Sequence, residues 1–382
     1  MVPDISWTLV LVRRVIQVQK KVSDIQTNGE FIKIARENLD QENWDYLVGG
    51  GESETTLLRN RQSIDSLAFR PRVMRNVVNI DTSTELLGSK LRIPVFLAPI
   101  GSLQRFTERG GITTSSAAHD FGIPAFISSV TKPDVREIRE VTDGDLFFQL
   151  YVRDDLDWIL RFVDLASELG CKGFCLTADT ANYGRRERDK IKGFEPRRAR
   201  TNTKSDGFVY QAALDWDVVD AIRKHSSIPL LVKGIVTAED AILAVEHGVE
   251  VIYISNHGGR QLDHGRGSID IIPEIISAVN GKAQVIVDGG FCRGTDIAKA
   301  IALGAHAVGI GKMYGLAASA GGGEAVIRML EILEEEFRLA LALLGVTSPK
   351  ELCPEHLQAV QPVRLPSFSS AFPHFDIEKY NY

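Results

Sequence analysis

The sequence contains few cysteines, and none of them forms a C-x-x-C pair. Four cysteines in 382 residues are too few for a disulfide framework, which is typical of a protein from a reducing compartment. We therefore expect no metal site and four free thiols, at Cys171, Cys175, Cys292 and Cys353.

Positive charge and long hydrophobic runs are also scarce. The formal net charge is -6, so the chain lacks the basic excess that binding to nucleic-acid phosphates requires. The N-terminal stretch SWTLVLVRRVIQVQKKV is interrupted by Arg13 and Arg14 and has no small-residue cleavage site, and the final YNY is not a peroxisomal S-K-L address. We expect a cytosolic protein with no nucleic-acid or membrane partner. Contact of the N-terminal stretch with a membrane surface is the alternative.

A regular alternation of two patterns begins at residue 94. Short β-branched runs alternate with amphipathic stretches such as 154–170 and 237–248, which is typical of parallel strands joined by helical crossovers. Thr237 is the expected N-cap of the second stretch, and Gly248 is its expected end. Eight such units predict an α/β protein with a closed (β/α)8 TIM barrel; an open doubly wound sheet is the alternative. The expected strands are 94–100, 124–129, 146–152, 173–179, 229–235, 251–256, 284–290 and 307–312.

Shorter segments flank the predicted barrel. Residues 1–93 form an N-terminal extension and a short helical cap, with helices expected at 29–39 and 54–64 and an extended stretch, LRIPVF, that leads into the barrel. The barrel domain is expected over 94–360, and its last part, 324–345, predicts an amphipathic helix on the barrel wall. Residues 361–382 form a C-terminal tail that either wraps a neighbouring subunit or is loose. Its aromatic residues are Phe368, Phe372, Phe375 and Tyr380.

Polar side chains stand at the end of every expected strand. In a TIM barrel the C-terminal strand ends form one face, so these groups are expected to converge on one site. A turn whose polar groups face water is the alternative for any one of them taken alone. The strand-end groups are Pro99, Ile100 and Gly101; Ser128 and Ser129; Gln149 and Tyr151; Thr177 and Asp179; Lys233; Ser255 and His257; Asp288; and Gly311 with Lys312.

The residue types at these ends suggest two binding sites. Gly289 and Gly290 after the seventh strand, with Arg293 at a helix start and Lys312 after the eighth strand, predict a site for a phosphorylated ligand. Arg260 offers a planar fork for a carboxylate, three residues from His257.

Two further strand-end groups could support this chemistry. Asp179 could hold the second ring nitrogen of His257 and fix its tautomer, as the aspartate of a catalytic triad does. Lys233 would place a positive charge beside an electron-rich cofactor ring; a lysine paired with a strand-end carboxylate is the alternative.

Taken together and in order, the motifs FFQLY, LTADT, GRRERD, LVKG, SNHGGRQLD and DGGFCRGTD resemble those of the FMN-dependent 2-hydroxy-acid oxidising family. That family includes glycolate oxidase, lactate oxidase, mandelate dehydrogenase and lactate 2-monooxygenase, and the resemblance spans residues 28–360. It implies FMN on a TIM barrel and oxidation of an L-2-hydroxy acid to the 2-oxo acid. Whether the α-hydrogen leaves as a hydride or as a proton stays open.

The resemblance also implies roles for single residues. His257 matches the base and Asp179 its partner, Arg260 and Arg186 match the carboxylate-binding arginines, and Tyr46 and Tyr151 match tyrosines at the substrate. Lys233 matches the lysine beside flavin N1 and O2. The remaining cofactor-binding residues implied are Pro99, Ile100, Gly101, Ser128, Gln149, Thr177, Ser255, Asp288, Gly289, Gly290, Arg293, Gly311 and Lys312.

The chain departs from the family pattern at several positions. Glycolate oxidases carry alanine at the position of Gly101, tryptophan at that of Val130 and arginine at that of Cys292. Arg293 and Lys312 would then carry the charge of the phosphate site. The loop after the sixth strand holds His264 and Arg266, which suggests a polar or larger acidic substrate. Residues 181–206 carry nine basic and four acidic residues and form either a solvated lid or a basic lid that attracts anionic substrates.

These observations predict an FMN-dependent oxidase of the CH–OH group of an L-2-hydroxy acid, with O2 as electron acceptor and H2O2 as product. A monooxygenase that decarboxylates its substrate and a dehydrogenase with another acceptor are alternatives within the family. An FMN-binding barrel with a non-oxidase activity is the alternative from another class. The family resemblance also implies a homotetramer.

Overall fold

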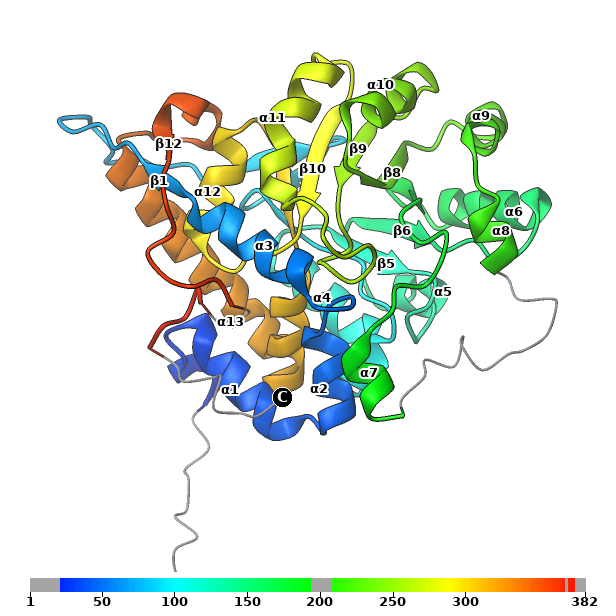
Figure 1. Ribbon diagram of the computed structural model, residues 1–382, viewed down its shortest axis with the longest axis horizontal. Helices are drawn as coiled ribbons and strands as arrows, with labels where there is room; N and C mark the ends of the chain where they lie inside the picture. The colour runs from blue at the N-terminus through cyan, green and yellow to red at the C-terminus, as the bar shows by residue number, and fades with distance from the viewer. Residues whose placement is uncertain (1–20, 194–207, 368–369, 375–382) are drawn as a thin grey trace, which may run out of the picture.

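The computed structural model describes residues 21–193, 208–367 and 370–374 (Figure 1). The segment 1–20, the second half of the predicted lid at 194–206, and the tail aromatics Phe368, Phe375 and Tyr380 lie outside the described residues. No helix in the described part of the chain is long and apolar enough to cross a membrane. All four cysteines are free, as expected from their number and spacing.

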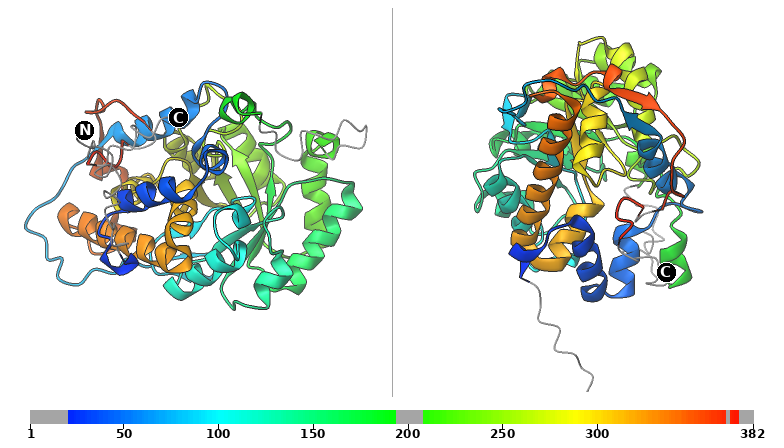
Figure 2. Two further views of the ribbon diagram at one scale, coloured as in Figure 1. Left: turned by 90° about the horizontal axis from the view of Figure 1, so that it is seen from below. Right: turned by 90° about the vertical axis from the view of Figure 1, so that its left-hand side faces the viewer.

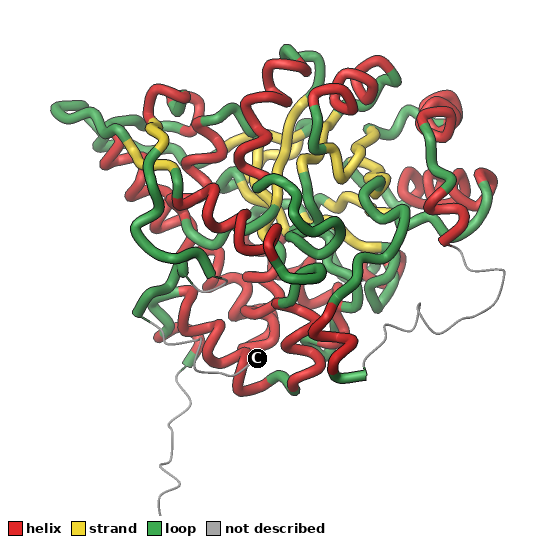
Figure 3. The backbone as a smooth tube through the Cα atoms, viewed as in Figure 1, coloured by secondary structure: helices red, strands yellow, loops and turns green. Residues whose placement is uncertain are grey.

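Eight parallel strands close into a barrel, in the order β10-β11-β4-β5-β6-β7-β8-β9. Each of the eight predicted strands is present, and the closed barrel excludes the open doubly wound sheet. Figure 3 shows the strands gathered in the middle of the molecule with helices around them. The strands are β4 Val95–Leu97, β5 Ala125–Ser128, β6 Leu146–Leu150, β7 Gly173–Thr177, β8 Leu230–Ile235, β9 Val251–Ile254, β10 Gln284–Asp288 and β11 Ala307–Ile310.

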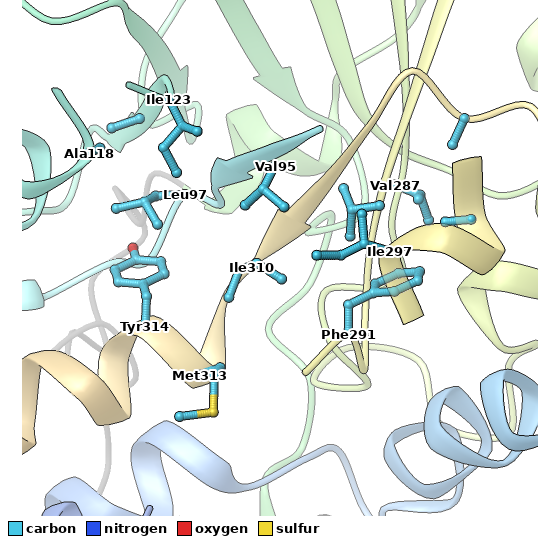
Figure 4. Close-up of a cluster of buried hydrophobic side chains, with 14 of the residues drawn as sticks. Val95, Leu97, Ala118, Ile123, Val287, Phe291, Ile297, Ile310, Met313 and Tyr314 are labelled. Atoms are coloured by element: carbon cyan, nitrogen blue, oxygen red, sulfur yellow. The ribbon is translucent and has the colours of Figure 1, made fainter. Parts of the chain in front are cut away.

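Two sets of apolar side chains, one on each side of the barrel wall, form the core. Inside the barrel the rings of Phe126 and Phe147 stack with centroids 4.6 Å apart, and Phe96 meets Tyr253 edge-on at 5.5 Å. Outside it, Val95, Leu97, Val287 and Ile310 pack against surrounding helices and loops (Figure 4). Because large rings fill the barrel interior, a ligand can bind only beyond a strand end.

Helices follow most of the strands and cover the barrel (Figure 2). The predicted stretches 154–170 and 237–248 contain α6 and α10, and the Thr237 hydroxyl caps α10 by accepting a hydrogen bond from the Asp240 amide at 3.3 Å. The helices after the strands are α4 Gly111–Phe121, α5 Val135–Arg139, α6 Leu156–Glu168, α7 Glu187–Ile191, α8 Phe208–Ala212, α9 Trp216–His225, α10 Ala238–Glu246, α11 Ser268–Val279 and α12 Gly294–Ala302.

The last long helix begins earlier than the sequence suggests. Helix α13 spans Lys312–Leu344, with non-helical backbone at Gly321 and Gly322, so the predicted helix at 324–345 is its second half. Lys312 is therefore the first residue of a helix rather than the end of the eighth strand. This position places the N-terminus of α13 beside the C-terminal end of β11.

The N-terminal cap contains the two predicted helices, α1 Asn28–Asn38 and α3 Thr55–Asp65, and two features that the sequence analysis missed. A third helix, α2 Gln41–Val48, is capped by Asp40, which accepts a hydrogen bond from the Asn43 amide at 2.7 Å. A hairpin of β2 Thr84–Leu86 and β3 Ser89–Leu91 precedes β4, and its buried leucines join the apolar cluster inside the barrel. A short 3-10 turn, η1 Val22–Asp24, precedes α1.

The C-terminal segment returns to the cap and the barrel wall. After the 3-10 turns η3 Pro349–Glu351 and η4 Pro354–His356, strand β12 Leu357–Ala359 pairs antiparallel with β1 Leu67–Phe69. Phe372 is 2% exposed, and the Arg293 guanidinium lies 5.2 Å from its ring centre. Phe372 thus packs against its own chain, whereas Val363 and Leu365 earlier in the tail are exposed.

Candidate active site

A cavity of about 770 Å³ opens at the C-terminal ends of the barrel strands. Its size is typical of sites for small ligands and cofactors. Six predicted residues stand behind its wall rather than in its lining, namely Asp179, Ser128, Gln149, Thr177, Ser255 and Arg293. The predicted residues that line it are Tyr46, Pro99, Ile100, Gly101, Tyr151, Arg186, Lys233, His257, Arg260, Asp288, Gly289, Gly290, Gly311 and Lys312.

His257 lies between an aspartate and a tyrosine. Its Nδ1 is 3.0 Å from Asp179 Oδ1, and its Nε2 is 3.1 Å from the Tyr151 hydroxyl oxygen. Burial lowers the pKa of His257 below its ordinary value, an effect that Asp179 opposes and Lys233 reinforces. Burial by itself would raise the pKa of Asp179. The charges of His257 and Lys233 together outweigh burial, so the pKa of Asp179 is lowered. At neutral pH the arrangement is therefore an ionised aspartate beside a neutral imidazole that can accept a proton.

Lys233 lies beneath the cavity and touches its floor. Its Nζ donates a hydrogen bond to Ser255 Oγ at 2.8 Å and is 4.0 Å from Asp179 Oδ2 and 3.9 Å from Asp288 Oδ2. Burial opposes protonation of this lysine, but the two carboxylates outweigh burial and raise its pKa. Lys233 is thus both a lysine paired with strand-end carboxylates and a fixed positive charge at the cavity.

Two arginines approach one aromatic ring from the cavity side. The Arg260 and Arg186 guanidinium carbons lie 5.2 Å and 5.9 Å from the centre of the Tyr46 ring. Arg260 is oriented by a 2.9 Å hydrogen bond to the Gly49 carbonyl. Burial, and then the charge of Arg186, lower the pKa of Arg260. Two buried cations this close together favour an anion between them, and Arg186 Nε has no hydrogen-bond partner among the described residues.

Residues behind the wall include one unsatisfied acceptor. Gln149 is fully buried, and its Nε2 donates to Thr177 Oγ1 at 2.8 Å. Its Oε1 has no hydrogen-bond partner in the part of the chain that the structure describes. Since a buried carbonyl oxygen without a partner costs about 1–3 kcal/mol, it marks a place where a ligand donor fits.

The helix start predicted as an anion site is already occupied. The Asp296 carboxylate accepts hydrogen bonds from the amides of Cys292 and Arg293 at 2.9 and 3.0 Å, and Glu336 accepts from the amide of Gly294 at 2.8 Å. The Arg293 guanidinium pairs with Glu336 at 2.9 Å and does not reach the cavity. The amides of Cys292, Arg293 and Gly294 at the N-terminus of α12 are therefore already bonded to carboxylates of the protein.

The next helix offers the better anion site. Gly311, Lys312 and Met313 at the N-terminus of α13 line the cavity, and Gly311 provides no side-chain cap. Lys312 Nζ donates to the Gly258 carbonyl at 2.8 Å, and burial lowers its pKa well below its ordinary value. An anion at this point would favour the charged form of Lys312.

Cys292 also lines the cavity. Burial raises the pKa of its thiol to about 12, so it stays a neutral thiol near pH 7. It is therefore a small uncharged group in the place where relatives carry an arginine.

Gly101 and Val130 face each other across the cavity edge. A Cβ built on Gly101 would lie 2.7 Å from Val130 Cγ2, closer than side-chain atoms approach one another. The two departures from the glycolate oxidase pattern, Gly101 and Val130, are therefore linked by packing. Val130 occupies the space that the methyl group of an alanine at position 101 would need.

The loop residues thought to shape the substrate pocket do not reach it. Arg266 hydrogen-bonds Glu274 at 2.5 Å, and the His264 side chain is 69% exposed. Neither lines the cavity, so the polar or larger acidic substrate that they suggested gains no support from these two residues. Sequence proximity to His257 was a misleading signal, because Gln261 is the last residue of this loop that lines the cavity.

Other cationic residues line the cavity without having been predicted. Arg153 follows β6, and its guanidinium carbon lies 5.9 Å from the centre of the Tyr151 ring. Arg105 pairs with Glu42 at the outer edge, and its Nε donates to Asn43 at 2.6 Å. Arg61 also lines the cavity but is bound to Asp296 by two hydrogen bonds of 2.7 and 3.0 Å. For Arg153 a signal existed, since it stands two residues beyond a predicted strand-end tyrosine.

Ion pairs join the start of the predicted lid to the cap. Helix α7 begins after Arg186, and its Arg188 binds Glu54 through hydrogen bonds of 2.6 and 2.5 Å. Lys192, just beyond the helix, pairs with the buried Asp45 of α2. These contacts set the position of α7 and therefore that of Arg186. We call this group the α7 anchor.

Comparison with known proteins gives a consistent result. Residues 35–359 match the family model described as FMN-dependent dehydrogenase. Glycolate oxidase from Spinacia oleracea is 36% identical over 355 residues, which cover 88% of this chain and 96% of the relative. L-lactate oxidase from Nostoc sp. is 36% identical over 351 residues, with coverages of 85% and 95%. A solved structure of a mandelate oxidase variant with the C4a-OH-FMN adduct aligns with a TM-score of 0.79 and 34% identity, covering 86% of this chain and 98% of that one. The chain therefore belongs to the FMN-dependent dehydrogenase family.

Proposed function

We propose that this protein is an FMN-dependent oxidase that converts an L-2-hydroxy acid to the 2-oxo acid, with O2 as electron acceptor and H2O2 as product. The observation that carries the proposal is that His257, held by Asp179, faces the same cavity as the arginine pair Arg186 and Arg260. The relatives named glycolate oxidase and L-lactate oxidase support both the substrate class and the acceptor.

The residues present fit FMN. Gln149 Oε1 is a buried acceptor that suits a ring N–H, and the charge of Lys233 suits the electron-rich edge of a flavin. Lys312 and the N-terminus of α13 suit a phosphate. When bound, FMN supplies a two-electron acceptor. The family resemblance implies further contacts from Ser128, Thr177, Ser255 and Asp288, and of these Asp288 lines the cavity.

The side chains of the site would then divide the reaction between them. Arg186 and Arg260 bind the carboxylate and so orient the carbon that bears the hydroxyl. Tyr151 hydrogen-bonds the hydroxyl, and His257 Nε2 accepts a proton from the substrate. Asp179 stabilises the imidazolium that forms. Overall the carbinol loses two electrons and two protons, and O2 gains them as H2O2.

The cellular context is a further part of the proposal. Four free thiols are consistent with a cytosolic location, and the family resemblance implies a homotetramer. Sedimentation of the purified holoenzyme measures the second point, because one protomer and four protomers differ fourfold in mass.

The test of the function is a flavin experiment with a matched variant. We expect purified protein to show a flavin spectrum, to lose it anaerobically with L-2-hydroxy acids, and to release one H2O2 per oxidised substrate in air. Release of CO2 in place of H2O2 would assign oxidative decarboxylation, which is the second candidate because Gly101 stands where glycolate oxidases carry alanine. His257→Ala is expected to retain FMN and to reduce it about 10²–10⁴-fold more slowly, since general base catalysis is lost. Protein that binds no FMN, or that no 2-hydroxy acid reduces, would overturn the proposal.

A further inference from the structure

We propose that Gln261 is a positioning residue of this site, which ties the loop after β7 to the loop after β9 and thereby sets the positions of Asp179 and Arg186. The inference rests on the proposed function, because it explains how the same site keeps its geometry. It goes beyond that function by giving a role to a residue of the SNHGGRQLD motif that no reaction step uses.

The side-chain amide of Gln261 bonds to one stretch of backbone at three points. Its Nε2 donates hydrogen bonds to the carbonyls of Asp179 at 3.0 Å and Asn182 at 2.9 Å, and its Oε1 accepts one from the Gly184 amide at 3.1 Å. Because carbonyls face the nitrogen and an N–H faces the oxygen, the partners themselves determine the orientation of the amide. Gln261 is 8% exposed, so these bonds are shielded from water.

The two loops also touch directly beside this amide. Residues 179–184 are turn, bend and irregular backbone between the end of β7 and the start of α7. A Cβ built on Gly184 would lie 2.9 Å from Gln261 Cα and in closer contact with the Arg260 carbonyl oxygen. A side chain at position 184 would therefore push the loops apart. Irregular backbone takes its shape from contacts of this kind, since it has no ladder of its own.

One end of the stretch carries the partner of the proposed base. The Asp179 carboxylate lies 3.0 Å from His257 Nδ1, and the Asp179 carbonyl is bonded to Gln261, which follows His257 in the same loop. These bonds close a ring that runs from His257 through Asp179 to Gln261 and back along the chain. A backbone shift that moves Asp179 away from His257 therefore costs the bond to Gln261.

The other end carries an arginine of the proposed carboxylate-binding pair. Tyr183 stands between two residues that bond to Gln261. The Arg186 guanidinium carbon lies 4.4 Å from the centre of the Tyr183 ring, and both side chains line the cavity. An arginine stacked on an aromatic face takes its position from that ring. Gln261 is thus joined to Arg186 through Tyr183, while the α7 anchor holds Arg186 from the other side.

The first test separates the two ends kinetically. Gln261→Met keeps the length of the side chain and removes its hydrogen bonds, and the probe is whichever of glycolate, L-lactate and (S)-mandelate reduces the wild-type flavin fastest without O2. We expect the limiting rate of flavin reduction to fall about tenfold or more and the apparent Kd of the probe to rise about threefold or more. In an Asp179→Asn background the same substitution should lower the rate about threefold or less and still raise the Kd, because its effect on the rate acts through Asp179.

Amide hydrogen exchange measures the same bonds without turnover. Peptides that cover residues 178–186 should exchange about tenfold faster in the Gln261→Met holoenzyme, since the Gly184 amide loses its acceptor. The matched control is Gln284→Met. Gln284 Oε1 accepts a hydrogen bond from the Leu87 amide at 2.9 Å, at the opposite end of the barrel. That variant should leave flavin reduction and the exchange of residues 178–186 as in the wild type.

A second variant guards against failure of the first to fold. Gln261→Glu keeps the size of the side chain and can accept from Gly184, but its carboxylate repels the two carbonyls that the glutamine amide binds. Its rate of flavin reduction should be no higher than that of Gln261→Met. FMN content verifies that each variant is folded.

The two proposals fail in different ways. Unchanged flavin reduction or unchanged exchange in the Gln261 variants would overturn the inference, as would a rate loss of full size in the Asp179→Asn background. If no 2-hydroxy acid bleaches the wild-type flavin, the proposed function itself is wrong, and the exchange of residues 178–186 still decides whether Gln261 holds the two loops together.

Discussion

His257 combines a lowered pKa with a carboxylate partner, although in water a carboxylate partner would raise the pKa of an imidazole. Its partner Asp179 would make an exposed imidazole more basic, but burial and Lys233 leave the pKa of His257 below its ordinary value of about 6.5. The imidazole is therefore neutral where the enzyme must accept a proton, and it has a carboxylate at 3.0 Å to stabilise the product charge. Both effects require that Asp179, which follows β7, lies close to His257, which follows β9. The closed barrel brings these two strand ends to the same face.

This arrangement predicts the direction of the pH dependence. Because the pKa of His257 is lowered, kcat/KM should stay level as pH falls through about 6.5 and decline only below that value. Asp179 raises the pKa of His257, so Asp179→Asn should move the acid limb to still lower pH while the plateau falls by about 10²–10⁴-fold. A pH series of initial rates measures both. An acid limb above pH 7 in the wild type would contradict the neutral-base assignment.

The Gly101–Val130 contact predicts a coupled pair of substitutions. Gly101→Ala places a methyl group 2.7 Å from Val130 Cγ2, and overpacking of this size costs about 1–2 kcal/mol. Denaturant unfolding of the holoenzyme should show that loss. Gly101→Ala combined with Val130→Ala should recover most of it, since the second change removes the colliding methyl. Additive losses in the double variant would show that the two residues are not coupled.

Motif spacing predicted which residues lie at the cavity when they closely follow a strand end. His257 and Arg260 follow a strand end directly, so their side chains could point only into the loop face of the barrel. Arg293 is different: its position at a helix start was predicted correctly, but Glu336, far along the chain, turns its guanidinium away from the cavity. Long side chains follow partners that a local pattern does not contain. Arg153 was missed although its position two residues after Tyr151 was a usable signal.

At the scale of elements, the α7 anchor connects substrate binding to the N-terminal cap. The Arg188 and Glu54 side chains are 20% and 17% exposed and make two parallel hydrogen bonds. Such a pair holds a short helix more firmly than an exposed ion pair does. Because α7 begins directly after Arg186, a looser anchor should weaken the grip on the substrate carboxylate.

Glu54→Gln tests the anchor. Loss of the charge partner of Arg188 should raise KM about threefold to tenfold, equivalent to about 0.6–1.4 kcal/mol, with a smaller change in kcat. The matched control is Glu187→Gln, because Glu187 lies on the same helix in an exposed pair with Arg185. Steady-state kinetics at low ionic strength separate the two. An equal KM in both variants would show that α7 is positioned by other contacts.

Strands were easier to predict than the cap helices. Strands of a parallel barrel are buried on both faces, so each one is a short run of apolar residues that differs clearly from the polar sequence on either side. Helix α2 has no such signal, because QENWDYLV contains several weak helix formers. Its stability comes from the Asp40 cap and from the burial of Trp44, which is 1% exposed. The β2–β3 hairpin was missed because its turn, Leu87-Gly88, places a leucine at φ +47°.

At the scale of the whole molecule, the cavity is lined by residues from the first and last barrel elements and from the cap. A ligand bound there stabilises only the folded chain, and FMN at a hundred times its Kd would add about 2.7 kcal/mol. The melting temperature should therefore rise on FMN addition, and rise less with riboflavin at equal concentration. Lys312→Met should remove that difference if Lys312 and the start of α13 hold the phosphate. An FMN effect equal to that of riboflavin in the wild type would place the phosphate outside this site.

The closure of the barrel has a consequence for how the protein is made. β4 is the first barrel strand to be synthesised, and one of its edges pairs with β11, where Leu97 lies opposite Ile310. At ordinary translation rates that partner leaves the ribosome about 10–40 s later. During this interval the nascent chain carries an unpaired strand edge beside apolar side chains that have no final contacts. The time available to a chaperone acting on this protein is therefore set by the spacing between β4 and β11.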